Sequence, residues 1–358
     1  MIYVHVPFCK RFCTYCDFYS ELVKEGCFKA YANDLCAEIR RRAGEMDDHP
    51  KTLYFGGGTP SVLPLSVLTR ILIALDEAGH GGPYREFTME VNPEDIVEKG
   101  RSYVESLKAL GVNRVSIGVQ SFDDGMLKWM NRRHDAARAR EAFRIVRETG
   151  IDNISIDLIF GVSHLTDEIW AATVDEAVAL GPEHISCYQL TVEGESALAE
   201  MVADGRYVEA DDTLCRRQYD ILCQKLSAAG FRHYEISNFA RPGFEAVHNG
   251  GYWARRPYVG LGPAAHSFQG STRSWNSKAL HGWTSTTETL SAEDALVETI
   301  MLALRTDKGI DAAFLHGNCS KEDIGRLERN GALARVGDRY RIPEDRFFVS
   351  DEIIRELI

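Results

Sequence analysis

The stretch HVPFCKRFCTYCDFYS, residues 5–20, carries three cysteines in the spacing C-x3-C-x2-C. Thiolates from Cys9, Cys13 and Cys16 can hold a [4Fe–4S] cluster and leave one of its irons without a protein ligand. An iron left open in this way can bind a small molecule and deliver an electron to it. The apolar residues 2–6 just upstream predict a short buried strand, so the cysteine loop would follow its carboxyl end.

Structural zinc, a disulfide pair and unconnected core thiols are the alternatives for these cysteines. A finger-like zinc site pairs one C-x2-C with a second ligand pair downstream, and the chain has no second C-x2-C. Several of the other six cysteines fall on apolar helix faces or in a strand, where Cys behaves as a small hydrophobe. An iron–sulfur cluster with three protein ligands is therefore the best interpretation. The six scattered cysteines are Cys27, Cys36, Cys187, Cys215, Cys223 and Cys319.

The composition argues against several classes of protein. The 358 residues include 41 Lys and Arg against 53 Asp and Glu, a net charge of −12, which disfavours a general nucleic-acid binder. Nine cysteines, an odd number in a long chain, do not fit a secreted disulfide framework. No window approaches the run of about 18 apolar residues that a membrane span needs, and no basic, apolar leader is present. We expect a cytoplasmic protein without an integral membrane segment.

Short apolar runs alternate with helical patterns over the first two-thirds of the chain. This alternation predicts βαβ units and hence a parallel sheet of the α/β class. Six strands predict an incomplete TIM-like (β/α)6 barrel, open on one side, over residues 1–205; eight would close it. The predicted strands are 2–6, 52–55, 86–91, 114–119, 154–159 and 184–190, and the predicted helices are 28–39, 67–75, 101–110, 136–148 and 167–180.

Polar residues stand at the carboxyl ends of these otherwise apolar strands. The glycine-rich loop 56–60 follows the second strand, Glu90 ends the third, Gln120 ends the fourth, and Asp157 lies in the fifth. The loop lacks the Lys-Ser/Thr of a P-loop and the spacing of a dinucleotide site, so we interpret it as a place where the backbone approaches a ligand. In a barrel of this kind the strand ends form one rim, which predicts a single site.

The remaining third of the chain shows a different pattern. Residues 206–284 would extend the barrel and carry the sequence HNGGYW at 248–253. Residues 285–358 predict a small winged-helix-like domain, with an amphipathic helix over 288–305 and a hairpin of 332–336 and 339–342. No helix dense in Lys and Arg appears in it, so we expect it to cover the barrel or dock a partner rather than to bind nucleic acid.

Several of these segments together resemble the radical S-adenosylmethionine (SAM) superfamily. YVHVPFC (3–9), YFGGGTPS (54–61), VNPED (91–95), RVSIGVQSF (114–122) and SIDLIFGV (155–162) resemble the oxygen-independent coproporphyrinogen III oxidase-like family. HYEISNFARPG (233–243), HNGGYW and YVGLGPAAHSF (258–268) resemble its haem chaperone branch. The resemblance covers nearly the whole chain.

The resemblance implies which residues hold the cofactors. The three cysteines would ligate the cluster, and SAM would occupy its fourth iron. Arg133, the neighbour of Arg132, could serve in its place, and no residue is assigned a catalytic role. The implied SAM residues are Tyr3, Tyr15, Gly57, Gly58, Thr59, Glu90, Gln120, Arg132 and Asp157.

Two departures from the oxidase pattern decide between the branches. The oxidases carry a further cysteine two residues after the third, where this chain has Phe18, and they have an N-terminal extension before the cluster strand. Both departures favour a haem chaperone that passes haem to acceptor haemoproteins. The alternative is a radical SAM enzyme that acts on a tetrapyrrole, so enzymatic activity stays open at this point.

The resemblance also implies haem binding by the HNGGYW sequence. His248 would be the axial ligand, and the nearby aromatic residues would supply an apolar wall for the macrocycle. His233 and His266 are rivals in neighbouring segments. From the residues alone, a loop histidine hydrogen-bonded to a backbone carbonyl is the simpler interpretation. The sequence leaves open whether the chain forms a homodimer.

Overall fold

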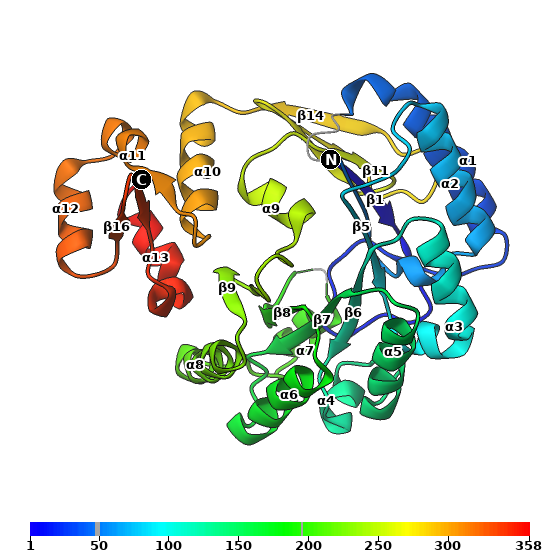
Figure 1. Cartoon of the computed structure of the whole chain (residues 1–358), viewed down its shortest axis with the longest axis horizontal. Coiled ribbons are helices and arrows are strands. Elements are labelled where there is room, and N and C mark those ends of the chain that lie inside the picture. Colours follow the sequence, from blue (N-terminus) through cyan, green and yellow to red (C-terminus); the bar gives the residue numbers. More distant parts are fainter. Residues whose placement is uncertain (47–50, 195) are drawn as a thin grey trace.

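Six parallel strands form the central sheet of the protein, whose computed structural model describes residues 1–46, 51–194 and 196–358 (Figure 1). They lie side by side in chain order, as right-handed βαβ crossovers require. All six predicted strands are confirmed, with ends shifted by at most a few residues. They are β1 (Ile2–Val6), β4 (Thr52–Gly57), β5 (Glu86–Val91), β6 (Arg114–Gln120), β7 (Asn153–Phe160) and β8 (His184–Gln189).

The sheet is wider than the six strands that the sequence predicts. β11 (Val259–Leu261) pairs in parallel with β1 at one edge. β10 (Asn238–Ala240) pairs antiparallel with β8, and β9 (Arg232–Glu235) pairs with β10, so the sheet has nine strands in the part of the chain that the structure describes. These three strands have only three or four residues, too few to show an alternating pattern. The first part of the extension after residue 205 thus contributes β9, β10 and β11 to the same sheet.

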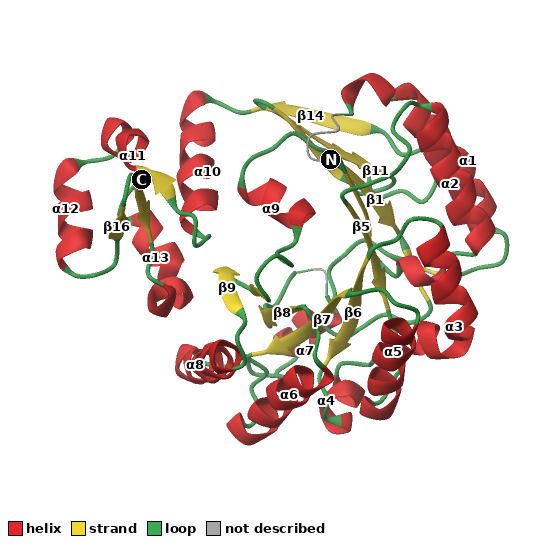
Figure 2. Cartoon of the chain, viewed as in Figure 1, coloured by secondary structure: helices red, strands yellow, loops and turns green. Residues whose placement is uncertain are grey.

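Helices cover the outer face of this sheet (Figure 2). The longer ones bury an apolar stripe, as α5 does with Ala139, Phe143 and Val146. Glycines in the left-handed region end several helices, with Gly181 at φ 74° after α6. The helices are α1 (Cys27–Arg41), α2 (Leu65–Glu77), α3 (Pro93–Ala109), α4 (Asp124–Trp129), α5 (Ala136–Glu148), α6 (Asp167–Leu180), α7 (Ala197–Ala203) and α8 (Asp212–Ala228).

The helix predicted over 101–110 is confirmed as the second part of α3, because Gly100, at φ 71°, is not helical and separates it from a first part that begins at Pro93. This first part was not predicted from the sequence. It carries many charges, so its apolar period is weak, and Pro93 at the first position starts it.

Beyond β11 the chain forms two small units. β12 (His266–Gln269), β13 (Thr272–Asn276) and β14 (Ser285–Thr289) make an antiparallel sheet. The helix predicted from residue 288 begins later, as α10 (Ala292–Leu304), because Ser291 caps it and pairs reciprocally with Asp294. The predicted hairpin is confirmed by β16 (Ala334–Val336) and β17 (Arg339–Arg341), which pair next to β15 (Ile310–Asp311). The helices of this unit are α11 (Ala312–Asn318), α12 (Lys321–Arg329) and α13 (Ser350–Arg355).

The segment α9 (Val247–Trp253) contains the HNGGYW sequence and lies between the β9 and β11 edges of the sheet (Figure 1). Its first two backbone N–H groups, of Val247 and His248, donate to the Glu86 carboxylate on β5 over 2.7 and 2.8 Å. This contact ties the helix to the start of a central strand. Among the described helices, none is both long enough and apolar enough to cross a membrane.

Candidate functional site

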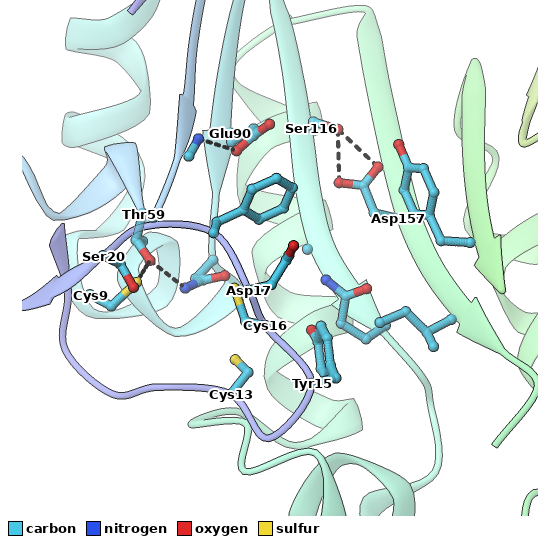
Figure 3. A pocket seen from close by; sticks show the side chains of 18 of the residues that line it. Cys9, Cys13, Tyr15, Cys16, Asp17, Ser20, Thr59, Glu90, Ser116 and Asp157 are labelled. Atoms are coloured by element: carbon cyan, nitrogen blue, oxygen red, sulfur yellow. Dashed lines mark hydrogen bonds between the residues drawn. The ribbon is translucent and has the colours of Figure 1, made fainter. Parts of the chain in front are cut away.

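A cavity of about 750 Å³ opens at the carboxyl ends of the parallel strands. Nearly all residues that the sequence predicts for the cluster and for SAM line it, together with neighbours from the same strands (Figure 3). The cysteine loop lies on one side of this cavity, and Glu90, Ser116 and Asp157 lie on the other. The predicted residues in its wall are Cys9, Cys13, Tyr15, Cys16, Gly57, Gly58, Thr59, Glu90, Gln120, Arg132 and Asp157.

Backbone contacts hold the cysteine loop over the cavity. Cys9 ends the short strand β2 (Phe8–Cys9), which pairs in parallel with β3 (Glu21–Leu22). The Thr14 N–H donates to Met130 O over 3.2 Å, and Thr14 O accepts from Leu198 N over 2.8 Å. The loop that carries the three thiols is thus fastened at both ends and in the middle.

The environment of the thiols suits metal ligands. Cys9 Sγ lies 3.4 Å from Thr59 Oγ1, and Arg132 Nη1 donates to Cys13 Sγ over 3.2 Å. Burial raises the pKa of Cys9, and it raises the pKa of Cys16 to about 12. A thiol in such a place loses its proton only when a cation replaces it, which is how metal centres form from buried cysteines. The three thiols therefore fit an iron–sulfur cluster.

A single zinc ion fits this arrangement less well. In a [4Fe–4S] cluster each cysteine binds a different iron, whereas zinc needs its ligands around one point. Within residues 1–46, 51–194 and 196–358, no three His, Cys, Asp or Glu side chains gather around one ion.

The glycine loop packs directly against the cysteine strand. Gly57 has φ 104°, and a Cβ built on it would lie 2.5 Å from His5 Cε1. A Cβ on Gly58 would lie 2.9 Å from both Val6 O and Phe8 O, while the Gly58 N–H donates to Val6 O over 2.9 Å. Only glycine fits at these two positions, so the loop leaves its backbone exposed to whatever fills the cavity.

Two partly buried carboxylates face the cavity, Glu90 from β5 and Asp157 from β7, the strands on either side of β6. Glu90 accepts from Tyr54 Oη over 2.7 Å and from Gly57 N over 3.2 Å. Burial raises the pKa of Glu90 to about 7, with the charge of Asp157 acting in the same direction. Asp157 accepts from Ser116 Oγ over 2.9 and 3.0 Å, and burial raises its pKa as well. These groups suit the ammonium and hydroxyl donors that SAM carries.

Gln120 and Arg132 complete the predicted rim. Gln120 sits at φ 67°, where the register of β6 against β7 shifts, and such strained residues cluster at functional sites. Arg132 Nη2 donates to Asn92 Oδ1 and to Gly118 O, both over 2.7 Å, and its side chain lines the cavity. Arg133 instead forms ion pairs with Glu94, Asp95 and Glu98. The geometry therefore favours Arg132 over Arg133.

Two predicted residues stand outside the cavity wall. Tyr3 Oη contacts His5 Nδ1 over 3.1 Å behind the glycine loop. His248 is fully buried: its Nδ1 contacts Thr52 Oγ1 and its Nε2 contacts Tyr252 Oη, each over 2.8 Å. Both ring nitrogens are occupied, so His248 could bind an iron only if α9 moved. This structure gives the axial-ligand hypothesis no support.

The rival histidines differ in accessibility. His233 is buried against Phe239, with ring centroids 4.0 Å apart, and its Nε2 contacts Tyr219 Oη over 3.3 Å. His266 is exposed on β12 and stacks on Trp275. Of the three predicted histidines, His266 is the one whose imidazole faces solvent.

His248→Gln is expected to remove a pH dependence of stability. Burial lowers the pKa of His248 to about 3 in the fold, against about 6.5 in an unfolded chain. A neutral folded histidine stabilises the protein above pH 6.5, and this contribution is lost as pH falls towards 3. Between pH 7 and pH 5 the wild-type protein should lose about 2 kcal/mol more unfolding free energy than the variant. Urea unfolding of haem-free protein measures this, and parallel pH profiles would contradict it.

Sequence reasoning missed several residues of the cavity wall. Ser116 and Arg114 lie four and six residues before Gln120 on β6, and Tyr54 precedes the glycine loop. The signal that could have identified Ser116 and Arg114 was the period of two in a strand, since alternate residues face the same side as Gln120. Asn249, next to His248, also lines the cavity, and no pattern in the sequence distinguishes it from its neighbours.

Comparison with known proteins shows which proteins this chain is similar to. A family model, Radical SAM superfamily, matches residues 3–177. The "Heme chaperone HemW" of Synechocystis is 34% identical over 94% of this chain and 84% of its own length. The "Heme chaperone HemW" of Mycobacterium tuberculosis is 34% identical over 100% of this chain and 94% of its own length. The structure of the coproporphyrinogen III oxidase HemN from Escherichia coli superposes with a TM-score of 0.81 over 99% of this chain and 89% of that one, at 21% identity, which supports a common fold.

Proposed function

We propose that this chain, which belongs to the radical SAM superfamily and within it to the haem chaperone family HemW, binds haem and passes it to acceptor haemoproteins. The observation that chiefly supports this proposal is the match, at 34% identity over nearly the whole length, to proteins named haem chaperones. Phe18, at the place of the oxidases' further cysteine, supports the same choice. The likeness to coproporphyrinogen III oxidase rests on the fold, at 21% identity.

In this proposal the cavity holds the [4Fe–4S] cluster and SAM, which together supply one-electron chemistry when bound. Cys9, Cys13 and Cys16 hold the cluster. The backbone of Gly57 and Gly58 borders the methionyl end of SAM, and Thr59 stands beside Cys9. Other residues of the wall orient the remaining polar groups of SAM, namely Tyr15, Glu90, Gln120, Arg132 and Asp157.

Two exposed aromatic side chains beside the cysteines support haem binding. Phe18 is 64% exposed and Phe12 is 47% exposed, and both border the cavity. Large apolar side chains that stay in water at the mouth of a cavity usually mark a binding surface. A flat macrocycle could cover these rings, whereas a cysteine at position 18 would offer a thiol instead.

Haem titration of the cluster-loaded protein tests the proposal. We expect a stoichiometric Soret shift, with the dissociation constant raised about 10-fold or more in Phe18→Ala because covering a phenylalanine contributes about 1.5–3 kcal/mol. Phe314→Ala is the matched control, since Phe314 is 37% exposed but lies on α11. The absence of a stoichiometric shift in the wild-type protein would overturn the proposal.

The iron ligand is tested by exchanging His233, His248 and His266 for alanine, singly and together. A Soret band that is the same in the triple variant as in the wild-type protein would exclude histidine ligation. His248→Ala also needs a melting curve, because it removes the contacts of the ring with Thr52 and Tyr252.

A radical SAM enzyme acting on a tetrapyrrole is the second candidate, favoured by the shared fold with the oxidase. Incubation with dithionite, SAM and coproporphyrinogen III separates the two. Decarboxylated product would make the protein an oxidase, and no product leaves the chaperone proposal standing.

Cytoplasmic location and a homodimer are further parts of the proposal. The first is supported by the bacterial relatives and is tested by fractionation of the cells that make the protein. For the second, light scattering of the haem-free and haem-loaded protein gives the mass directly. A mass of one chain in both states would remove the homodimer from the proposal.

A further inference from the structure

Below the predicted SAM residues, the inner face of the sheet carries a row of polar side chains with unused hydrogen-bonding groups. Thr88, Arg114 and Asn153 are register partners on β5, β6 and β7. Thr88 Oγ1, Arg114 Nε and Asn153 Oδ1 are all buried, and none has a hydrogen-bond partner among the residues that the structure describes. Native proteins leave few such atoms, and each needs an explanation such as a ligand or an ordered water.

Arg114 links this row to the cavity of the cluster site. Side chains two residues apart on a strand share a face, and Ser116, which follows Arg114 by two residues, lines the cavity. Glu90 follows Thr88 by two residues and also lines it. Arg114 itself is part of the cavity wall although only 1% of its surface reaches solvent. Arg114 therefore lies at the floor of the cavity, away from the cysteine loop, with Thr88 and Asn153 as its neighbours in the sheet.

The guanidinium of Arg114 gives this floor its chemistry. Arginine keeps its charge at any physiological pH, and its planar set of donors matches a carboxylate. A buried charge is costly unless an anion or hydrogen bonds compensate it. Asn249 of the HNGGYW sequence lines the same cavity and offers an amide donor.

The acidic residues near Arg114 already have donors of their own. Glu86 accepts from the Val247 and His248 backbone N–H groups, and Asp157 accepts from Ser116 Oγ. Glu90 accepts from Tyr54 Oη. Their hydrogen bonds are thus directed elsewhere, and the unused Nε–H of Arg114 stays available for a further acceptor.

We infer that Arg114, assisted by Asn249, binds a carboxylate group of the ligand that enters the cavity. Under the proposed function, on which this inference rests, that group is a propionate of the tetrapyrrole. The carboxylate of SAM and a free small acid are the other sources of the same chemistry. His248 then acts as a positioning residue, because its contacts with Thr52 and Tyr252 hold α9 so that Asn249 faces the cavity.

The decisive experiment compares haem with haem dimethyl ester, in which both propionates are blocked. The cluster-loaded wild-type protein should bind haem about 10- to 100-fold more tightly than the ester, since a hydrogen bond to a charged group contributes about 1.5–3 kcal/mol. This comparison needs no substitution, so it does not depend on the folding of a variant. Equal affinities would overturn the inference, whereas no binding of either compound would overturn the proposed function itself.

Substitutions then assign the preference to its residues. Arg114→Met should bind haem only as tightly as the ester, Arg114→Lys should keep part of the preference, and Asn249→Leu should weaken haem binding about 3- to 10-fold. Arg255→Met is the matched control, because Arg255 pairs with Glu298 outside the cavity wall. Melting curves and cluster absorbance show that each variant folds.

The same variants separate the sources of the carboxylate. SAM affinity should be unchanged in Arg114→Met. Acetate at about 10 mM, a concentration typical of weak carboxylate binding, should not compete with haem for the protein. A loss of SAM binding, competition by acetate, or an undiminished preference for haem in Arg114→Met would each overturn the assignment to the tetrapyrrole.

Discussion

Cys16→Ala is expected to abolish the iron–sulfur cluster. The wild-type protein, reconstituted without oxygen, should hold about four irons and four sulfides per chain, and the variant should fall to background. In the proposed assignment the cluster has three protein ligands and none to spare, and Cys16, which is half-buried, is one of them. Iron, sulfide and zinc analysis on the same samples measures the effect.

Cys319→Ala is the matched control for this experiment. Cys319 is half-buried like Cys16, but it follows α11 in the C-terminal unit. Its variant should keep the full iron and sulfide content. A Cys16→Ala protein that still holds about four irons would contradict the ligand assignment. One zinc ion per wild-type chain would instead show that the cysteines form a structural zinc site.

Gly57→Ala is expected to destroy SAM binding and to destabilise the fold. The left-handed backbone at φ 104° costs an alanine about 1–2 kcal/mol, and its Cβ would lie 2.5 Å from the His5 ring. His5 is held by Tyr3 and by Tyr19 O, so it cannot yield freely. Overpacking of this kind adds about 1–3 kcal/mol, so the unfolding free energy should fall by about 2–5 kcal/mol.

Urea unfolding and equilibrium dialysis with SAM measure the two effects of Gly57→Ala. Gly44→Ala serves as the control, because a Cβ at Gly44 meets nothing within 4 Å and its backbone is not in the left-handed region. If Gly57→Ala bound SAM as tightly as the wild-type protein, the glycine loop would not border the ligand, and its glycines would serve packing alone.

The barrel was predictable because its elements are long and periodic. All six central strands were found, and α5 and α6 have the predicted bounds. Their apolar residues recur with the period of a strand or a helix, and caps such as Asp135 and Gly181 mark the ends. The three edge strands were missed because they are short, and their place depends on pairing with β1 and β8.

The residues of the candidate site were predictable where polar side chains stand in apolar strands. They were not predictable where tertiary packing determines which side chains are buried. Glu90 and Gln120 were found because they stand at the ends of apolar strands, and Asp157 because it interrupts an apolar strand. Arg114 was missed because an arginine at the start of a strand has the pattern of a surface residue, although it is 1% exposed. His248 was predicted to be the axial ligand of haem, but in the structure its two ring nitrogens are hydrogen-bonded to Thr52 and Tyr252.

The sequence by itself determined the chemistry at the carboxyl end of the barrel. The spacing C-x3-C-x2-C, the glycine loop and Phe18 are local features, and local spacing is enough to state which atoms can bind iron or approach a ligand. Tertiary structure alone decided which side chains reach the cavity. Burial and hydrogen bonding join residues far apart in the chain, such as Glu86 with α9 and Thr52 with His248. Because of these contacts, His248 lies outside the cavity wall and Asn249 lines it.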